Sequence, residues 1–262
     1  MRTRILVGLV AIPIVLLPLW YGGVWTALLV LLIALAGGNE YFRLLAQGGY
    51  RPAYWLGMFW LGVTVLSGWR PDLLPLDLVL TTGLLATLIY SLFQHENQVH
   101  TWLATSGGAI YFGLLLSQGV ALRQMTDGLA WLMLGLLITW FNDTAAYFAG
   151  VYLGNHKLWP RISPKKTWEG TVGGWLGGAL AGALVVQFTP IPISLGMGIL
   201  IGFVGGVLAL FGDLVESMIK RQVGVKDSGQ FFPGHGGMWD RMDSILFVMP
   251  FVYQVALWFT KN

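Results

Sequence analysis

The chain is a succession of long apolar runs interrupted by glycine, proline and short clusters of charged residues. A helix needs about 20 apolar residues to cross a hydrocarbon core roughly 30 Å thick, and many of the runs approach that length. Breaking the sequence at the interruptions therefore predicts its membrane helices. The nine predicted helices cover residues 5–21, 24–42, 53–69, 73–93, 102–121, 129–151, 171–189, 193–212 and 243–260. The first two are joined by Gly22-Gly23, so a re-entrant hairpin is the alternative for that pair.

The composition supports the same fold class. Only 10% of the 262 residues are charged and 56% are apolar, whereas soluble domains carry about 25% charged residues. We expect an all-α, polytopic integral membrane protein with one membrane domain over residues 1–262. More than half of the charged residues lie between positions 140 and 243, so residues 1–139 are predicted to be mainly scaffold helices. Residues 140–243 are predicted to hold the active-site helices and loops, and 243–260 the last helix.

Cysteine content and charge exclude several function classes. The chain has no cysteine, which excludes disulfides, thiolate nucleophiles and cysteine-ligated zinc. The net charge of +3 suits a membrane that carries anionic lipid. Because no basic run is interleaved with aromatic residues, nucleic acid is not an expected partner.

The distribution of Lys and Arg predicts the orientation, because cytoplasmic loops are enriched in these residues. With the N-terminus inside, one side of the membrane holds twelve of the 15, including both basic clusters described below. The other side holds Arg70, Arg123 and Lys261. The basic clusters are therefore predicted to face the cytoplasm.

The segment from Ser217 to Asp243 has the strongest chemical signal. Three cations, Lys220, Arg221 and Lys226, precede a glycine-rich turn. Such a combination suits a nucleoside triphosphate, because cations neutralise phosphate oxygens and free glycine N–H groups can cradle them.

Two aspartates are predicted to open the last helix, and a third ends the helix before it. Asp240 and Asp243, spaced i and i+3, are expected on one helix face, where they could share a hard cation such as Mg²⁺. Asp213 is the natural third carboxylate. The alternative for any one of these charges is a solvated residue that anchors a helix end. His235, between two glycines, could bind phosphate, protonate a leaving group or cap a turn.

A second basic cluster leads directly into the predicted seventh helix. Ser163 and Thr167 are candidate caps for that helix, and Glu169 suits its positive end. Lys165 and Lys166 beside a helix N-terminus indicate a second anion site. Their alternative role is to anchor the helix end against anionic headgroups.

An acidic residue also lies within the predicted sixth helix, where Asn142 precedes Asp143. An unpaired carboxylate in the bilayer core costs at least ~2.5 kcal/mol, so Asp143 should face protein or water and have a partner. A structural ion pair with a lysine is the alternative to a substrate role.

Glycines at four-residue spacing mark the predicted seventh and eighth helices and let helix backbones approach closely. They are Gly173 and Gly177, then Gly174, Gly178 and Gly182, and finally Gly198, Gly202 and Gly206. We expect these faces to pack within one chain, and a homodimer interface is the alternative.

At these residues the sequence resembles the phosphatidate cytidylyltransferase family, also called CDP-diglyceride synthetases. The segment from Ser217 to Asp243 matches the family signature at every position, and segments 142–147 and 163–170 are also similar to it. The resemblance implies attack by a phosphatidic acid oxygen on the α-phosphorus of CTP, with Mg²⁺ required and a second cation as an option. It also implies a location in the bacterial inner membrane with the site facing the cytoplasm.

The resemblance assigns roles residue by residue. Catalytic roles fall to Asp213, Asp240, Asp243 and Lys226, and the three aspartates are also the expected metal ligands. Substrate binding falls to Asn142, Asp143, Ser163, Lys165, Lys166, Thr167, Glu169, Ser217, Lys220, Arg221, Asp227, His235, Gly236, Gly237 and Arg241.

Two other functions would fit part of this pattern. A CTP-dependent kinase of polyprenols also needs metal, cations and a nucleotide, but it would release CDP. A secondary transporter would place Asp143 and glycine-interrupted helices in the membrane, but the charges gather near one interface and no repeated half is visible.

Overall fold

A computed structural model describes residues 13–231 and 236–261, and its architecture is helical. A first helical stretch covers 13–21, while the part of the predicted helix 5–21 that precedes residue 13 lies outside the described residues. The labelled helices are α2 (Gly23–Gln47), α3 (Tyr54–Ser67), α4 (Leu76–Leu92), α5 (Gln98–Gly108), the π-helix η1 (Ala109–Leu114), α6 (Leu115–Arg123), α7 (Gly128–Tyr152), α8 (Trp168–Phe188), α9 (Leu195–Gln222), the 3₁₀ turn η2 (Trp239–Arg241) and α10 (Asp243–Lys261). Two short strands, β1 (Lys157–Trp159) and β2 (Ser163–Thr167), form an antiparallel hairpin.

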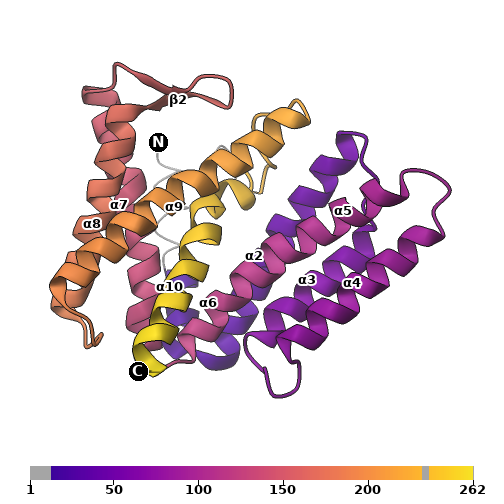
Figure 1. Cartoon of the computed structure of the whole chain (residues 1–262), viewed down its shortest axis with the longest axis horizontal. Coiled ribbons are helices and arrows are strands. Elements are labelled where there is room, and N and C mark those ends of the chain that lie inside the picture. The colour runs from indigo at the N-terminus through magenta and orange to yellow at the C-terminus, as the bar shows by residue number, and fades with distance from the viewer. Residues whose placement is uncertain (1–12, 232–235, 262) are drawn as a thin grey trace.

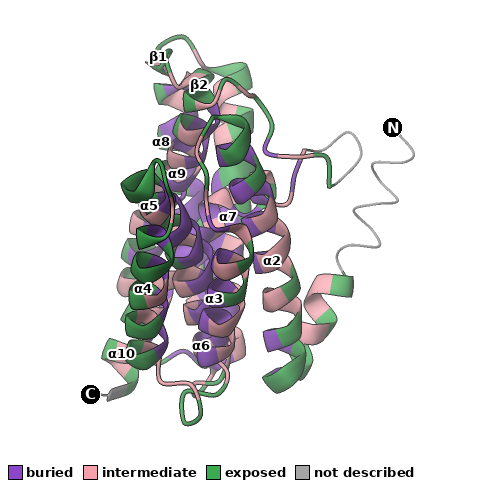
Figure 2. Ribbon diagram, turned by 90° about the vertical axis from the view of Figure 1, so that its right-hand side faces the viewer, coloured by how far each residue is buried: buried purple, intermediate pink, exposed green. Residues whose placement is uncertain are grey.

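The helices confirm an all-α polytopic membrane protein. Six of the described helices are long and apolar enough to cross a bilayer, with α5, η1 and α6 forming one continuous span. Helices α3 and α4 are apolar but shorter. Figure 2 shows exposed residues on the outer surfaces of the bundle and buried residues between the helices.

The bundle has two packed groups of helices. In Figure 1, α2 to α5 gather on one side and α7, α8 and α9 on the other, with α6 and α10 between them. One buried apolar cluster joins α2, α3 and η1 to Trp239 and Leu246, and a second joins α7, α8, α9 and α10. The start of the last helix is thereby attached to both groups.

The glycine faces pack within the chain, as expected. A Cβ on Gly178 would lie 2.5 Å from the Gly202 carbonyl oxygen, so α8 and α9 approach backbone to backbone. A Cβ on Gly177 would lie 2.6 Å from the Phe141 oxygen, which brings α7 equally close to α8. Small residues permit such packing where lipid offers no hydrophobic drive for helices to associate.

One predicted helix end and one predicted helix face were wrong. Helix α9 does not end at residue 212 but continues to Gln222, because Asp213 and Glu216 find partners one turn later in Ser217 and Lys220. The last helix begins at Asp243, while Asp240 lies in the preceding turn η2. Asp240 and Asp243 therefore do not share a helix face.

The connection from α7 to α8 is the β-hairpin, which the hydrophobic pattern did not predict. Thr167 caps α8 by accepting a hydrogen bond from the Gly170 N–H at 3.2 Å, as expected of a cap. Ser163 does not cap the helix, because it begins strand β2. In Figure 1 this hairpin lies at the same end of the molecule as the C-terminal end of α9, while the α8–α9 connection lies at the opposite end.

Candidate functional site

A cavity of about 420 Å³ lies where α7, β2, α8 and α9 meet. Its polar lining comes from Asn142 and Asp143 on α7, Lys165 and Lys166 on β2, and Asp213 on α9. The structure thus brings together three clusters that are separate in the sequence, as expected for one site. The N-terminus of α8 also contributes to its wall through Thr167 and Gly170.

The carboxylates of this cavity contact a lysine and polar side chains. The Lys166 ammonium lies 2.8 Å from Asp213 Oδ2, and the Ser217 hydroxyl donates to Asp213 Oδ1 at 3.3 Å. Asp143 has the partner expected of it, because the Asn142 amide donates to its Oδ1 at 3.2 Å. The Lys165 side chain is exposed and the Lys166 side chain is half-buried, so both lysines are accessible to an anionic ligand.

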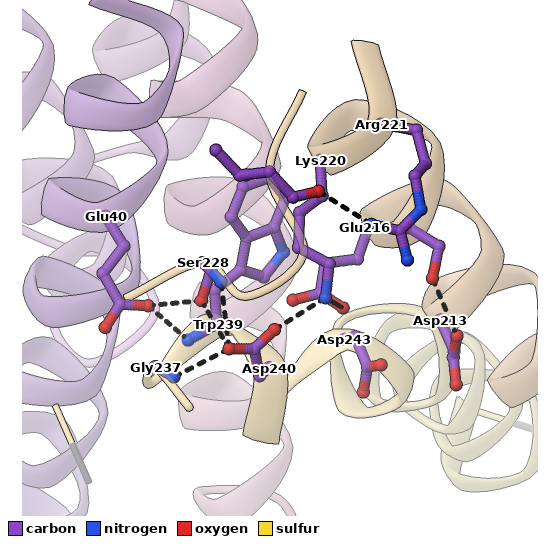
Figure 3. A network of polar contacts seen from close by, with 12 residues as sticks. Glu40, Asp213, Glu216, Lys220, Arg221, Ser228, Gly237, Trp239, Asp240 and Asp243 are labelled. Atoms are coloured by element: carbon purple, nitrogen blue, oxygen red, sulfur yellow. Dashed lines mark hydrogen bonds and ion pairs between the residues drawn. The ribbon is translucent and has the colours of Figure 1, made fainter. Parts of the chain in front are cut away.

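Asp243 belongs with these carboxylates. A Cβ on Gly212 would overlap the Asp243 carbonyl, and the Ser244 hydroxyl donates to the Ala209 oxygen at 3.2 Å, so the start of α10 packs directly on α9 beside Asp213. The negative charges of Asp213 and Asp143 both act on Asp243. Figure 3 shows Asp213 and Asp243 together on one side of the polar network, with Asp240 on the other.

Asp240 lies in a separate cluster with Lys220 and Glu216. The Lys220 ammonium is 2.6 Å from Asp240 Oδ1 and 2.9 Å from Glu216 Oε2, and the three side chains are 3–11% exposed. The other Asp240 oxygen accepts hydrogen bonds from Gly237 N at 2.7 Å and Ser228 N at 3.0 Å. Both oxygens of Asp240 are therefore engaged by protein donors.

These donors determine the ionisation of Asp240. Burial would raise the pKa of this carboxyl, but hydrogen bonds from the Lys220 ammonium and the Gly237 N–H outweigh it and lower the pKa to about 2. Asp240 is thus ionised throughout the range in which a cell works.

Among the described residues, no group of three or more His, Asp or Glu side chains is arranged to hold a metal ion. Asp213 and Asp243 nevertheless offer two neighbouring hard oxygen ligands at the cavity. Mg²⁺ is often held by one or two carboxylates completed by substrate phosphates. Asp213 and Asp243 fit such an ion, and the metal roles of Asp213, Asp240 and Asp243 all stay predictions.

The remaining predicted residues are distributed around the two clusters. The Arg221 guanidinium donates to the Val225 oxygen at 2.8 Å, while Lys226 and Asp227 are exposed. Arg241 is exposed and its charge acts on Asp143. Glu169 accepts from the His156 ring at 2.6 Å rather than facing the cavity lysines. His235 lies outside the described residues.

Sequence reasoning missed Glu40, which lies on α2 in the half predicted to be scaffold. Its carboxylate accepts hydrogen bonds from Ser228, Met238 and Trp239 of the signature segment, although it precedes them by almost 200 residues (Figure 3). The one sequence signal was an acidic residue inside the apolar run 24–42.

Comparison with known proteins identifies the family to which the chain belongs. The profile of the cytidylyltransferase family matches residues 2–259. A phosphatidate cytidylyltransferase of Bacillus subtilis (strain 168) is 42% identical over 146 residues, which are 55% of this chain and 54% of the relative. The phosphatidate cytidylyltransferase of Staphylococcus aureus (strain COL) is 46% identical over 128 residues, which are 48% of each chain. The chain thus spans about half the length of the curated relatives that it matches.

Proposed function

We propose that this chain, which belongs to the cytidylyltransferase family, is a membrane enzyme that transfers the cytidylyl group of CTP to phosphatidic acid. The products are CDP-diacylglycerol and pyrophosphate. The observation that carries the proposal is the cavity in which two lysines, a helix N-terminus and acidic residues of two helices meet beside the signature segment. This arrangement provides neutralising charge for phosphates and carboxylates for a metal.

In the proposed reaction, an oxygen of the phosphatidic acid phosphate forms a bond to the α-phosphorus of CTP as the bond to pyrophosphate breaks. Lys165 and Lys166 hold substrate phosphates and neutralise their charge, and the first turn of α8 adds backbone N–H groups. Asp213 and Asp243 would hold Mg²⁺, which supplies further neutralisation of phosphate charge. The chemistry depends mainly on positioning and electrostatics and requires no protein nucleophile.

Lys220 differs from the cavity lysines, because its charge is already paired within the protein. Its ammonium already contacts two carboxylates and its side chain is 9% exposed. Direct phosphate binding by Lys220 stays a prediction, as it does for Lys226 and Arg241, whose side chains are exposed. Homodimer formation also stays a prediction.

The position of the label in CTP tests the reaction. Purified protein is incubated with phosphatidic acid, Mg²⁺ and CTP that carries ³²P in either the α- or the γ-phosphate. Cytidylyl transfer puts only α-label into lipid and releases γ-label in pyrophosphate. Transfer of γ-label into a polyprenol would instead establish the kinase, and no lipid label with either substrate would refute both.

We also propose that the site faces the cytoplasm of a bacterial inner membrane. Because the chain has no cysteine, single cysteines can be labelled without background. Asn155, Gln230 and Pro192 are exposed, the first two near the basic clusters and the third in the α8–α9 connection. A membrane-impermeant thiol reagent should label Pro192→Cys in intact cells and the other two variants only after permeabilisation. Labelling of Asn155→Cys or Gln230→Cys from outside would refute this orientation.

A further inference from the structure

Glu40 connects the N-terminal helices to the signature segment through a buried carboxylate. The residue lies in α2 and is 8% exposed. Its Oε2 accepts from the Ser228 hydroxyl at 2.8 Å and from Trp239 N at 2.9 Å, and its Oε1 accepts from Met238 N at 2.9 Å. Three donors from the segment that carries Asp240 thus converge on one side chain.

Two signature glycines are explained by the same contact. A Cβ on Gly229 would lie 2.6 Å from Glu40 Oε1, and a Cβ on Gly237 would overlap Glu40 Oε2 and the Ser228 hydroxyl. Any larger residue at either position would therefore displace the Glu40 carboxylate or push the segment away from α2. Glycine at both sites permits this close approach of backbone to carboxylate.

An aromatic contact lies next to the polar one. Trp239 is fully buried, with its ring 5.4 Å from Tyr41 and 5.5 Å from Phe112 between centroids. Phe112 lies in η1, and π-helical turns of this kind are frequent at functional sites. The residue after Trp239 is Asp240, so its contact with Lys220 depends on where α2 and η1 hold the turn.

We propose that Glu40 is a positioning residue. It holds Ser228 and residues 237–239 against α2, and thereby fixes Asp240 against Lys220 and the start of α10, with Asp243, against α9. Its effect on turnover rests on the proposed function, whereas its effect on the segment does not.

Glu40→Gln removes the charge with almost no change of shape. An amide has one acceptor oxygen, so in either orientation its NH₂ group opposes a backbone N–H, that of Met238 or that of Trp239. We expect kcat to fall roughly 10- to 100-fold, the equivalent of one lost hydrogen bond to a charged group. KM for CTP should change less than threefold, because the cavity lysines are untouched. Glu96→Gln, which changes an exposed glutamate, is the matched control.

Ser228→Ala removes one of the three donors without altering α2, and it keeps the test decisive if Glu40→Gln does not fold. Its kcat should fall by a smaller factor. If both changes act through the same contact, the double variant should be within about twofold of Glu40→Gln alone. Fully multiplicative effects would overturn the proposal.

A thiol at the exposed Gln230 reports on the segment independently of activity. In a Gln230→Cys background, Glu40→Gln should increase the rate of modification by a water-soluble thiol reagent severalfold, and Glu96→Gln should not. An unchanged rate, or a faster rate with unchanged kcat, would overturn the positioning role. A wild-type protein without transferase activity would refute the proposed function, while the labelling rates would still decide whether Glu40 holds the segment.

Discussion

Replacing Lys220 by methionine should destabilise the protein through charge rather than through packing. Lys220 is the one cation in contact with Glu216 and Asp240 among the described residues, and all three side chains are nearly buried. Methionine preserves most of the length and apolar volume of the lysine stem. The change leaves two carboxylates with no compensating charge between them.

The structure indicates that Glu216, rather than Asp240, is the carboxylate destabilised by this change. Asp240 keeps its hydrogen bonds from Ser228 and Gly237, whereas Glu216 loses the ammonium on Oε2, and its Oε1 has no hydrogen-bond partner among the described residues. Breaking a buried ion pair from one side costs about 3–5 kcal/mol. We expect a loss of that size in the free energy of unfolding of Lys220→Met.

Thermal unfolding in detergent measures the effect, with the exposed Lys157→Met as the control. Adding Glu216→Gln to Lys220→Met should recover a large part of the lost stability, because it neutralises the orphaned carboxylate, but it should not restore turnover. A Lys220→Met variant within about 1 kcal/mol of wild type would refute the buried-charge reasoning. So would a double variant less stable than Lys220→Met alone.

Further predictions address the cavity and the metal. Asp213→Asn and Asp243→Asn should each reduce turnover at least 100-fold at saturating Mg²⁺ while membrane insertion, measured by fractionation, is unchanged; substantial activity would remove them as ligands. Lys166→Ala should raise KM for a substrate at least tenfold, and Lys157→Ala should not; equal effects in steady-state assays would return Lys166 to an anchoring role. Chelation by EDTA should abolish transferase activity and added Mg²⁺ restore it, and full activity in EDTA would exclude a required metal. Because the pKa of Asp240 is lowered to about 2, its charge stabilises the fold above about pH 4, and this contribution is lost as the pH falls towards 2. Wild type should therefore lose its stability advantage over Asp240→Asn within that window in thermal unfolding scans, and an advantage that persists at pH 2 would contradict the lowered pKa.

The sequence predicted features that depend on local pattern. Apolar runs of membrane length predicted the helices, and the charges beside helix ends indicated site residues, of which Lys166 and Asp213 lie 2.8 Å apart in the structure. The end of α9 was wrong because a change to polar residues marks the end of the hydrophobic run, not of the helix. Beyond residue 212 the helix continues as far as Gln222, with side-chain pairs such as Glu216–Lys220 one turn apart.

Glu40 could not have been assigned from the sequence by the same means. Its partners lie 188 to 199 residues away, and nothing near position 40 resembles a motif. A buried carboxylate is costly unless it is hydrogen-bonded, so its presence in an apolar run indicated a partner but not which one. Only the packing of α2 against the signature segment identifies that partner.

The separation of Asp240 from Asp243 changes how their variants should be interpreted. Their i, i+3 spacing predicted one shared task on a helix face, but α10 begins at Asp243 and the turn before it points Asp240 towards Lys220. Asp240 therefore stabilises the turn, whereas Asp243 adds negative charge beside Asp213, which the proposed Mg²⁺ would neutralise. Asp240→Asn should consequently lower thermal stability and activity together. Asp243→Asn removes one of two repelling charges, so it should lose activity while keeping or gaining stability, and a loss of stability equal to that of Asp240→Asn would show that the two acids do share one task.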